Sequence, residues 1–246
     1  VTVTADFDGA ADSSVTGQGL LTMTDRAVID AGTGTIKLNA NEDVTLGQLV
    51  TTNATTSAIQ ITSNAGGVVD GGDTDGADII TASGRTLIDA ATGIGAADPL
   101  ETNVESIDAD STTGAIDIDN SLASTTTVIS LTTVDGTVNF DQTGGGDLSI
   151  IGDVTSGSVG PDVDGGNIEL TSTVDLTVAG TANISSAAGA GGLLSINETT
   201  VNAGAVITIG AGDVTLNGSG QDTVINATIT VATSATFTAT RDVIVG

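Results

Sequence analysis

The sequence predicts an all-β fold, a single right-handed parallel β-helix, on three observations. Apolar residues alternate with polar ones in short runs, and successive runs recur at short, similar intervals along the chain. The chain holds 34 Gly and is poor in the Glu, Lys, Arg, Leu and Met that build helices, a composition that favours strands and turns. A fifteen-residue unit occurs twice, as GTIKLNANEDVTLGQ at 34–48 and as GNIELTSTVDLTVAG at 166–180. Because stacked coils reuse a unit whereas a single globular core has no reason to, the repeat favours a solenoid.

Each copy of this unit predicts two short strands joined by a corner, since apolar residues stand at every second position on both sides of four variable residues. Such strands bury one set of side chains and expose the other. We therefore expect Ile36, Leu38, Ile168, Leu170, Leu176 and Val178 to be buried, with Lys37 and Glu169 outside. The same alternation predicts strands at Val44/Leu46, Ile59/Ile61, Ile116/Ile118, Ile129/Leu131, Val138/Phe140, Leu148/Ile150, Leu194/Ile196, Ile207/Ile209, Val214/Leu216, Ile229/Val231 and Val243/Val245.

A second duplication sets the expected coil length. RAVIDAGTG at 26–34 resembles RTLIDAATG at 85–93, and the offset of 59 residues fits three coils of about 20. The whole chain would then form about 12 coils in one solenoid segment, 1–246. The range 64–112 is the least regular and predicts an irregular coil insertion that bulges from the rod. Both ends of the chain resemble strands, so we interpret the segment as a window of a longer protein.

Charge and composition exclude several functions. Thirty-one acidic residues face four basic ones, a net charge of −27, which argues against nucleic-acid partners and anionic membrane surfaces. No apolar stretch approaches the roughly 18 residues of a spanning helix, so no membrane insertion is expected. The chain has no Cys, His or Tyr, which removes thiol chemistry and most acid–base catalysts, and we predict no enzyme. Asp117 and Asp119 could in principle cleave glycosides, but their alternation with Ile116 and Ile118 fits an outward strand face better.

Aspartates near glycines are the candidate metal ligands. VVDGGDTDGADII brings together Asp70, Asp73, Asp75 and Asp78, of which Asp73, Asp75 and Asp78 are the first candidate ligands, and the Asp-x-Asp-Gly core recurs at Asp6/Asp8 and Asp162/Asp164. Hard carboxylate oxygens of this kind suit Ca²⁺. The competing interpretation is a set of solvated Asp-Gly turns, because no copy has the Glu that completes an EF-hand loop.

Threonine pairs raise a further alternative. Thr-x-Thr occurs at Thr2/Thr4, Thr22/Thr24, Thr228/Thr230 and Thr236/Thr238/Thr240, and flat Thr arrays are similar to ice-binding surfaces. Because these pairs cluster at the two ends of the chain, the β-propensity of Thr explains them better.

The units GTIKLNANEDVTLG, GNIELTSTVDLTVAG and IDAATGIGAADPLETNVESIDADSTTGAIDIDN resemble repeats of the filamentous-haemagglutinin-like, two-partner-secreted giant bacterial surface adhesins. The resemblance covers most of the chain and implies a parallel β-helix, an extracellular place on the bacterial cell surface, and a role as adhesin stalk or fibre. Expected partners are adjoining coils or copies of the chain, and host or surface glycans or proteins. The alternative is a self-assembling extracellular filament or surface-layer subunit, whose copies stack through open terminal coils.

Overall fold

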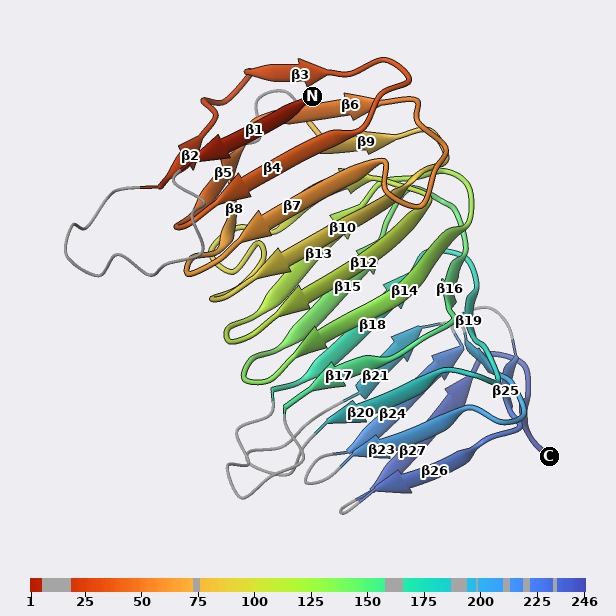
Figure 1. Ribbon diagram of the computed structural model, residues 1–246. Helices are drawn as coiled ribbons and strands as arrows, with labels where there is room; N and C mark the ends of the chain where they lie inside the picture. Colours follow the sequence, from red (N-terminus) through yellow and green to blue (C-terminus); the bar gives the residue numbers. More distant parts are fainter. Residues whose placement is uncertain are drawn as a thin grey trace.

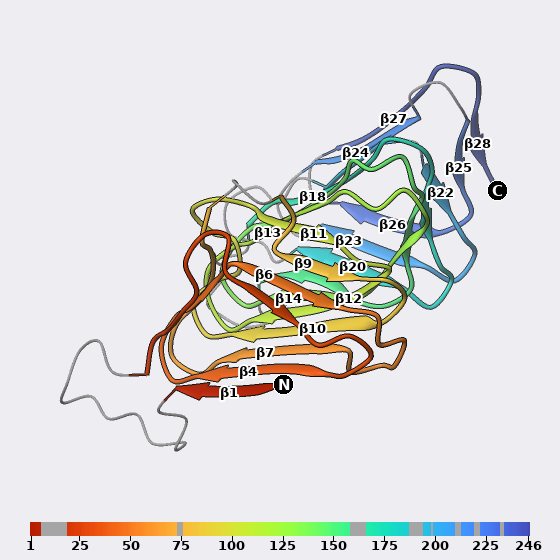
Figure 2. The same cartoon turned by 90° about the horizontal axis from the view of Figure 1, so that it is seen from above.

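The fold is an all-β, right-handed parallel solenoid of about 8 turns, here in a computed structural model (Figure 1). The structure describes residues 1–5, 19–72, 76–157, 166–186, 194–197, 199–209, 213–218, 222–231 and 234–246. Seen from above, the chain winds around the axis with β1, β4, β7 and β10 stacked along one side (Figure 2). The predicted fold class is therefore confirmed.

Three parallel sheets form the sides of the described solenoid. Sheet A contains β1 (Thr2–Ala5), β4 (Ile36–Ala40), β7 (Ile59–Ser63), β10 (Arg85–Ala90), β12 (Ser106–Ser111) and β14 (Thr126–Thr133), followed by two branches. Its β16 branch contains β16 (Leu148–Ile150), β19 (Leu176–Val178), β22 (Thr199–Val201), β25 (Thr223–Ile225) and β28 (Val243–Val245). Its β17 branch contains β17 (Val154–Ser156), β20 (Asn183–Ser186), β23 (Val206–Ile209) and β26 (Thr228–Val231).

The other two sheets close the turns. Sheet B contains β3 (Val28–Asp30), β6 (Gln48–Thr51), β9 (Ile79–Thr81), β11 (Leu100–Asn103), β13 (Ile116–Asn120), β15 (Val138–Gln142), β18 (Ile168–Ser172), β21 (Leu194–Asn197), β24 (Val214–Gly218) and β27 (Ala235–Ala239). Sheet C contains β2 (Leu21–Thr22), β5 (Val44–Leu46) and β8 (Val68–Asp70). The N- and C-terminal ends lie at opposite ends of the stack (Figure 1).

The core consists of aliphatic columns that run along the axis. Ile36 stacks on Ile59, and further along the same strands Leu38 stacks on Ile61. The six side chains predicted to be buried in the two copies of the repeat are fully inside, whereas Lys37 and Glu169 are exposed. Alternation at period two therefore correctly predicted the buried face of these strands. It failed at two other predicted strands, because Val128 and not Ile129 is buried in β14, beside a shift in register, and Val243 and Val245 of β28 are exposed.

The turns vary in length: some match the predicted coil, as from Val28 to Gln48 and from Leu194 to Val214, but others are longer. Ile36 pairs with Ile59 and Val154 pairs with Ile184, and both of these steps exceed the predicted coil of about 20 residues. The two copies around residues 26–34 and 85–93 lie on different sides, β3 in sheet B and β10 in sheet A. Their offset therefore does not measure a whole number of turns, which is why it gave too short a coil.

The range 64–112, for which we predicted an irregular insertion, includes strands β8 to β12. All five strands have parallel partners in the neighbouring turns. Within this range the irregular parts are the connections, such as residues 91–99, where Ile94 still forms single bridges to Val68 and Ile116.

Small hydroxyl residues stack at one corner of the solenoid. Ser63 Oγ donates to Glu42 O at 2.7 Å, Thr133 Oγ1 to Gly114 O at 2.8 Å and Ser156 Oγ to Gly136 O at 2.6 Å. These bonds tie the hydroxyl groups to backbone carbonyls of the bend, of which Gly136 O also accepts from Gly166 N at 3.1 Å. Gly114 has φ +82°, and a Cβ there would lie 2.1 Å from Thr92 O, so the corner requires glycine.

A buried polar network occupies a second corner. Asn120 is fully buried; its Oδ1 accepts from Thr102 Oγ1 at 2.9 Å, and its Nδ2 donates to Thr126 Oγ1 at 2.6 Å and to Gln142 Oε1 at 2.7 Å. Thr102, Thr126 and Gln142 are also fully buried. The network joins β11, β13, β14 and β15, and so links sheets A and B inside the rod.

Candidate metal centre

Three carboxylates from neighbouring turns converge at the junction of sheets B and C. Asp70 ends β8, Asp78 directly precedes β9 and Glu101 lies in β11. One carboxylate oxygen of each lies within 4.8 Å of the other two. Asp78 is fully buried, whereas Asp70 and Glu101 are half-buried.

Backbone hydrogen bonds between turns position two of these residues. The Asp78 amide donates to Glu101 O at 2.8 Å, and the Asp78 carbonyl accepts from Leu49 N at 2.7 Å. The backbone of Asp78 is therefore hydrogen-bonded to both neighbouring turns. The register of β9 and β11, with Ile79 opposite Thr102, brings Glu101 beside Asp78.

Two glycines let the chain leave β8 close to the preceding turn. Gly72 N donates to Asp70 Oδ1 at 2.8 Å, which fixes the Asp70 carboxylate in a tight turn. A Cβ at Gly71 would lie 2.0 Å from Leu46 O, so only glycine fits against β5. The Asp70-Gly71-Gly72 segment, which predicts a turn from the sequence alone, thus also brings Asp70 toward Asp78.

The chemistry of the three carboxylates suits a hard divalent cation. Like charges within 4.8 Å repel, and burial of Asp78 increases the cost of its charged form. A cation such as Ca²⁺, which prefers carboxylate oxygens, would relieve both effects. The donor set therefore fits the predicted metal, which Asp70, Asp78 and Glu101 could hold.

Of the predicted ligands, the structure brings only Asp78 into this cluster. Asp73, Asp75, Asp6, Asp8, Asp162 and Asp164 lie outside the described residues. Glu101 is absent from the sequence-based ligand set because it lies far from Asp78 along the chain, and only the β9–β11 register brings the two together. No local motif signals this pairing.

Outward acidic residues form two further groups on the sheet faces. On sheet A, Asp89 lies opposite Asp110, and burial, followed by the Asp110 charge, raises the pKa of Asp89. On sheet B, Asp119 lies opposite Asp141, and burial followed by the Asp141 charge raises the pKa of Asp119. Burial also raises the pKa of Asp117. The hydrogen bond that its carboxylate accepts from Asn139 Nδ2 at 2.8 Å acts in the opposite direction and lowers this pKa.

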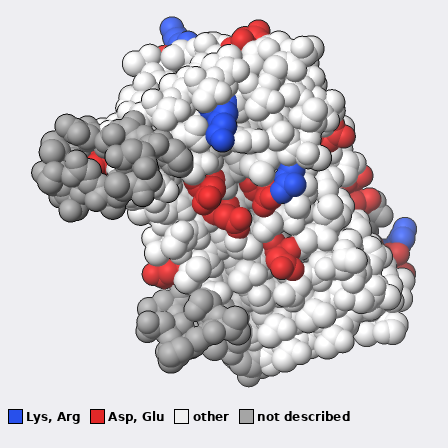
Figure 3. All heavy atoms as spheres, viewed as in Figure 1, with Lys and Arg blue, Asp and Glu red and all other residues white. Residues whose placement is uncertain are grey.

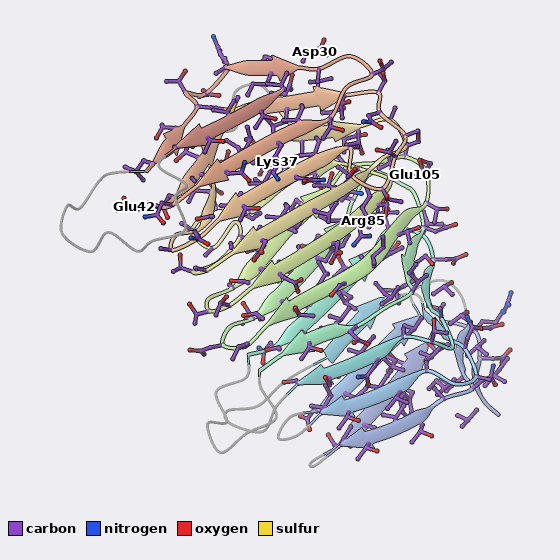
Figure 4. The ribbon with its side chains drawn as sticks, in the orientation of Figure 1. Asp30, Lys37, Glu42, Arg85 and Glu105 are labelled. Carbon is purple, nitrogen blue, oxygen red and sulfur yellow. The ribbon has the colours of Figure 1, made fainter. Side chains whose placement is uncertain are left out.

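Two of the four basic residues form ion pairs with acidic residues. Arg85 forms an ion pair with Asp108 across β10 and β12. Arg241 Nε donates to Asp222 Oδ1 at 2.7 Å, and this hydrogen bond is the main cause of the lowered pKa of Asp222. Lys37 lies on the outer face of β4, on the same side of the rod as Arg85 (Figure 4).

A shallow cavity of about 230 Å³ lies on the outer face of sheet A. Its lining includes Gln60, Thr62, Leu87, Asp89, Asp108 and Asp110. In the space-filling view, red acidic atoms gather in this central region, close to two blue basic groups (Figure 3). This acidic groove separates the upper face of sheet A from its lower, β17 branch.

Within the described ranges there is no helix long and apolar enough to cross a membrane. Comparisons with protein-family models, with curated proteins and with solved structures find no match to this chain.

Proposed function

We propose that the chain is a structural, non-catalytic rod of a secreted bacterial cell-surface protein, acting as adhesin stalk or extracellular fibre. The observation that carries this proposal is the parallel stack that continues from β1 to β28. Such a stack separates the two ends of the chain, as a spacer must (Figure 1). The acidic surface supports it, because a net charge of −27 opposes non-specific clumping of neighbouring rods.

Location is the first test of this proposal. An antibody raised against the purified chain should label intact cells of the source bacterium, and protease added outside should remove the signal. A cytosolic control protein must stay protected in the same cells. Labelling only after lysis would contradict the proposal.

The second candidate is a self-assembling extracellular filament or surface-layer subunit. It is favoured by the parallel pairing of each described turn with the next, because strands of separate copies could pair in the same way. The complete reading frame distinguishes the candidates, since a very long frame with a secretion domain supports the stalk and a frame no longer than this chain supports the subunit.

We further propose that Ca²⁺ binds the folded rod and stabilises it, with Asp70, Asp78 and Glu101 as ligands. The support is the convergence of the three carboxylates within 4.8 Å, with Asp78 fully buried. As partners we propose adjoining coils or other copies of the chain, and glycans or proteins on host or bacterial surfaces.

A further inference from the structure

The sequence contains a single Asp–Pro peptide bond, which joins Asp98 to Pro99. The bond lies in the connection that precedes β11, where Asp98 is exposed and Pro99 is half-buried. Proline is compatible with this position because it stands directly before the strand. Its nitrogen belongs to a tertiary amide, and a protonated secondary amine leaves more easily than the nitrogen of an ordinary peptide bond. Asp98 and Pro99 therefore supply an adjacent carboxylate and a good leaving group, the two requirements for a peptide bond to be cleaved from within the chain.

A second carboxyl group lies beside this bond on the next turn. Leu100 is opposite Ile118 in the register of β11 and β13, so the preceding residue, Pro99, is level with Asp117. The side chain of Asp117 is on the outer face of β13, because alternation buries its two neighbours in the strand. Asn139 Nδ2 on β15 donates to Asp117 Oδ1 at 2.8 Å and so orients this carboxyl group. The register thus brings together two acids that the sequence separates.

Gly95 holds the Asp98 carbonyl, which is the carbonyl of the Asp–Pro bond, against the same turn. The Gly95 N–H donates to Val68 O at 2.9 Å, and the φ of Gly95 is +61°. A Cβ added at Gly95 would lie 2.2 Å from Asp117 O and 3.2 Å from Asp98 O, so only glycine allows these backbones to approach. The bond is therefore held in place relative to Asp117, and reacting groups that are held together react faster than groups on a loose chain.

We propose that the Asp98–Pro99 bond is a site of self-cleavage, with Asp98 as nucleophile and Asp117 as proton donor. An oxygen of the Asp98 carboxylate bonds to the Asp98 carbonyl carbon and forms a cyclic anhydride. The C–N bond to Pro99 breaks, and the Pro99 nitrogen takes a proton from Asp117. Water then opens the anhydride. The products are a chain that ends in Asp98 with two carboxyl groups and a chain that begins with the secondary amine of Pro99, and Asp117 regains its proton from solvent.

The charges around Asp117 favour its role as proton donor. Burial, together with the charges of Asp141 and Asp98, raises the pKa of Asp117 and outweighs the hydrogen bond from Asn139. A raised pKa keeps the proton on Asp117 to a higher pH. The charged side chains on β13 and on the strands and connection packed against it are all acidic: Asp98, Glu101, Asp117, Asp119 and Asp141. Cleavage should therefore accelerate as the pH falls, and slow as the pH rises and Asp117 loses its proton.

The two parts of the chain stay joined after this cleavage. β9 and β10 belong to the part that ends at Asp98, and they pair with β11 and β12 of the part that begins at Pro99. A cut rod therefore keeps its shape in native solution and comes apart only when it unfolds. The inference goes beyond the rod proposal and does not depend on it, because cleavage is a single event within the chain and an uncut rod can still be a stalk.

Incubation of the full chain at about pH 4 and at about pH 7 tests the proposal. We expect denaturing electrophoresis and mass spectrometry to find a single cut, between Asp98 and Pro99, which forms faster at the lower pH. The mass in native solution should remain that of one whole chain. In urea that abolishes the circular dichroism of the fold, cleavage should be about a hundredfold slower, because Asp117 is then no longer beside the bond.

Three variants, each shown to be folded by circular dichroism, separate the roles of the groups. Asp98→Ala removes the nucleophile and should abolish the cut, whereas Asp117→Asn should slow it about a hundredfold. The matched control is Asp119→Asn, the same change at the next outward position of β13, which should cleave at close to the wild-type rate. A wild-type chain that stays intact at about pH 4 overturns the proposal. So does a cut that is equally fast in urea, because the fold would then contribute nothing. Equal rates for Asp117→Asn and Asp119→Asn overturn the assignment of Asp117 as proton donor.

Discussion

At the residue scale, Asn120 is the polar side chain on which the inner network depends. It joins Thr102, Thr126 and Gln142 inside the rod. The alternation of IDIDN places Asn120 in phase with the buried Ile116 and Ile118, whereas the exposed Asn167 directly precedes the buried Ile168 and is out of phase. Its inward position can therefore be predicted from the sequence, but its partners on β11, β14 and β15 are revealed only by the fold.

We expect Asn120→Ala to lower the free energy of unfolding by about 3 kcal/mol, since it leaves several buried donors and acceptors without partners. Asn103→Ala is the control, because its Nδ2 lies 3.3 Å from Ser121 Oγ in an exposed position. That change should stay within about 0.5 kcal/mol. Urea unfolding followed by circular dichroism measures both, and equal effects would contradict a special role for Asn120.

A substitution at Thr86 is expected to raise the free energy of unfolding, in contrast to Asn120→Ala. Its side chain is fully buried between Ile59 and Ile107, and its hydroxyl has no hydrogen-bond partner among the described residues. Thr86→Val removes this buried hydroxyl and should raise the unfolding free energy by about 1 kcal/mol. Thr102→Val, which removes a hydroxyl bonded to Asn120, should instead lower it by about 1 kcal/mol or more. If both variants shift stability in the same direction, the assignment of Thr86 is wrong.

At the element scale, the repeated unit specifies two strands and their corner but not a side of the rod. Its first copy forms β4 and β5, in sheets A and C, whereas its second forms β18 and β19, in sheets B and A. Alternation decides which side chains point inward, and the sequence shows it directly. The side occupied depends on the lengths of all preceding connections, which local patterns do not fix. This is also why Glu101 could not be predicted as a ligand beside Asp78.

The Asp89–Asp110 pair between β10 and β12 predicts a pH dependence. Because the folded pKa of Asp89 is raised, the folded chain binds this proton more tightly than the unfolded chain does. The stabilisation is therefore present at low pH and is lost as the pH rises through the folded pKa. We expect Asp110→Asn to raise the melting temperature at pH 7 and to reduce the gain on acidification toward about pH 4.

Asp153→Asn is the control for this pair. Asp153 is exposed beside β17, and neither β17 nor its partners β14 and β20 contain an acidic residue. Melting curves at several pH values should show the wild-type pH dependence for this variant. Identical curves for Asp110→Asn and the wild type would show that the two carboxylates do not interact.

At the scale of the whole molecule, the proposed cation binding links stability to solution composition. A cation that binds only the folded rod adds about 2.7 kcal/mol at a hundredfold excess over its Kd. We expect millimolar Ca²⁺ at fixed ionic strength to raise the melting temperature and chelation to reverse the rise. Equal melting temperatures with and without Ca²⁺ would contradict the proposal. An equal rise in melting temperature with sodium would show that the effect is only screening of the negative charges.

A matched pair of variants assigns the effect to the candidate centre. Asp70 Oδ1 accepts from Gly72 N at 2.8 Å, and Asp30 Oδ1 accepts from Gly32 N at the same distance in a similar turn. Asp70→Asn should lose most of the Ca²⁺-dependent gain, whereas Asp30→Asn should keep it. If both variants retain the gain, the cation binds elsewhere on the acidic surface.

The parallel stack also determines how the rod responds to tension. Each turn is hydrogen-bonded only to the turns above and below it, so a pull on the two ends detaches the outermost turn first. The turns are unequal, since the one from Val154 to Ile184 is longer than the one from Ile36 to Ile59. Each would release roughly 80–100 Å of chain at about 3.4 Å per residue. A rod of this kind lengthens in discrete steps under load, and so can absorb mechanical work while most of its turns remain folded.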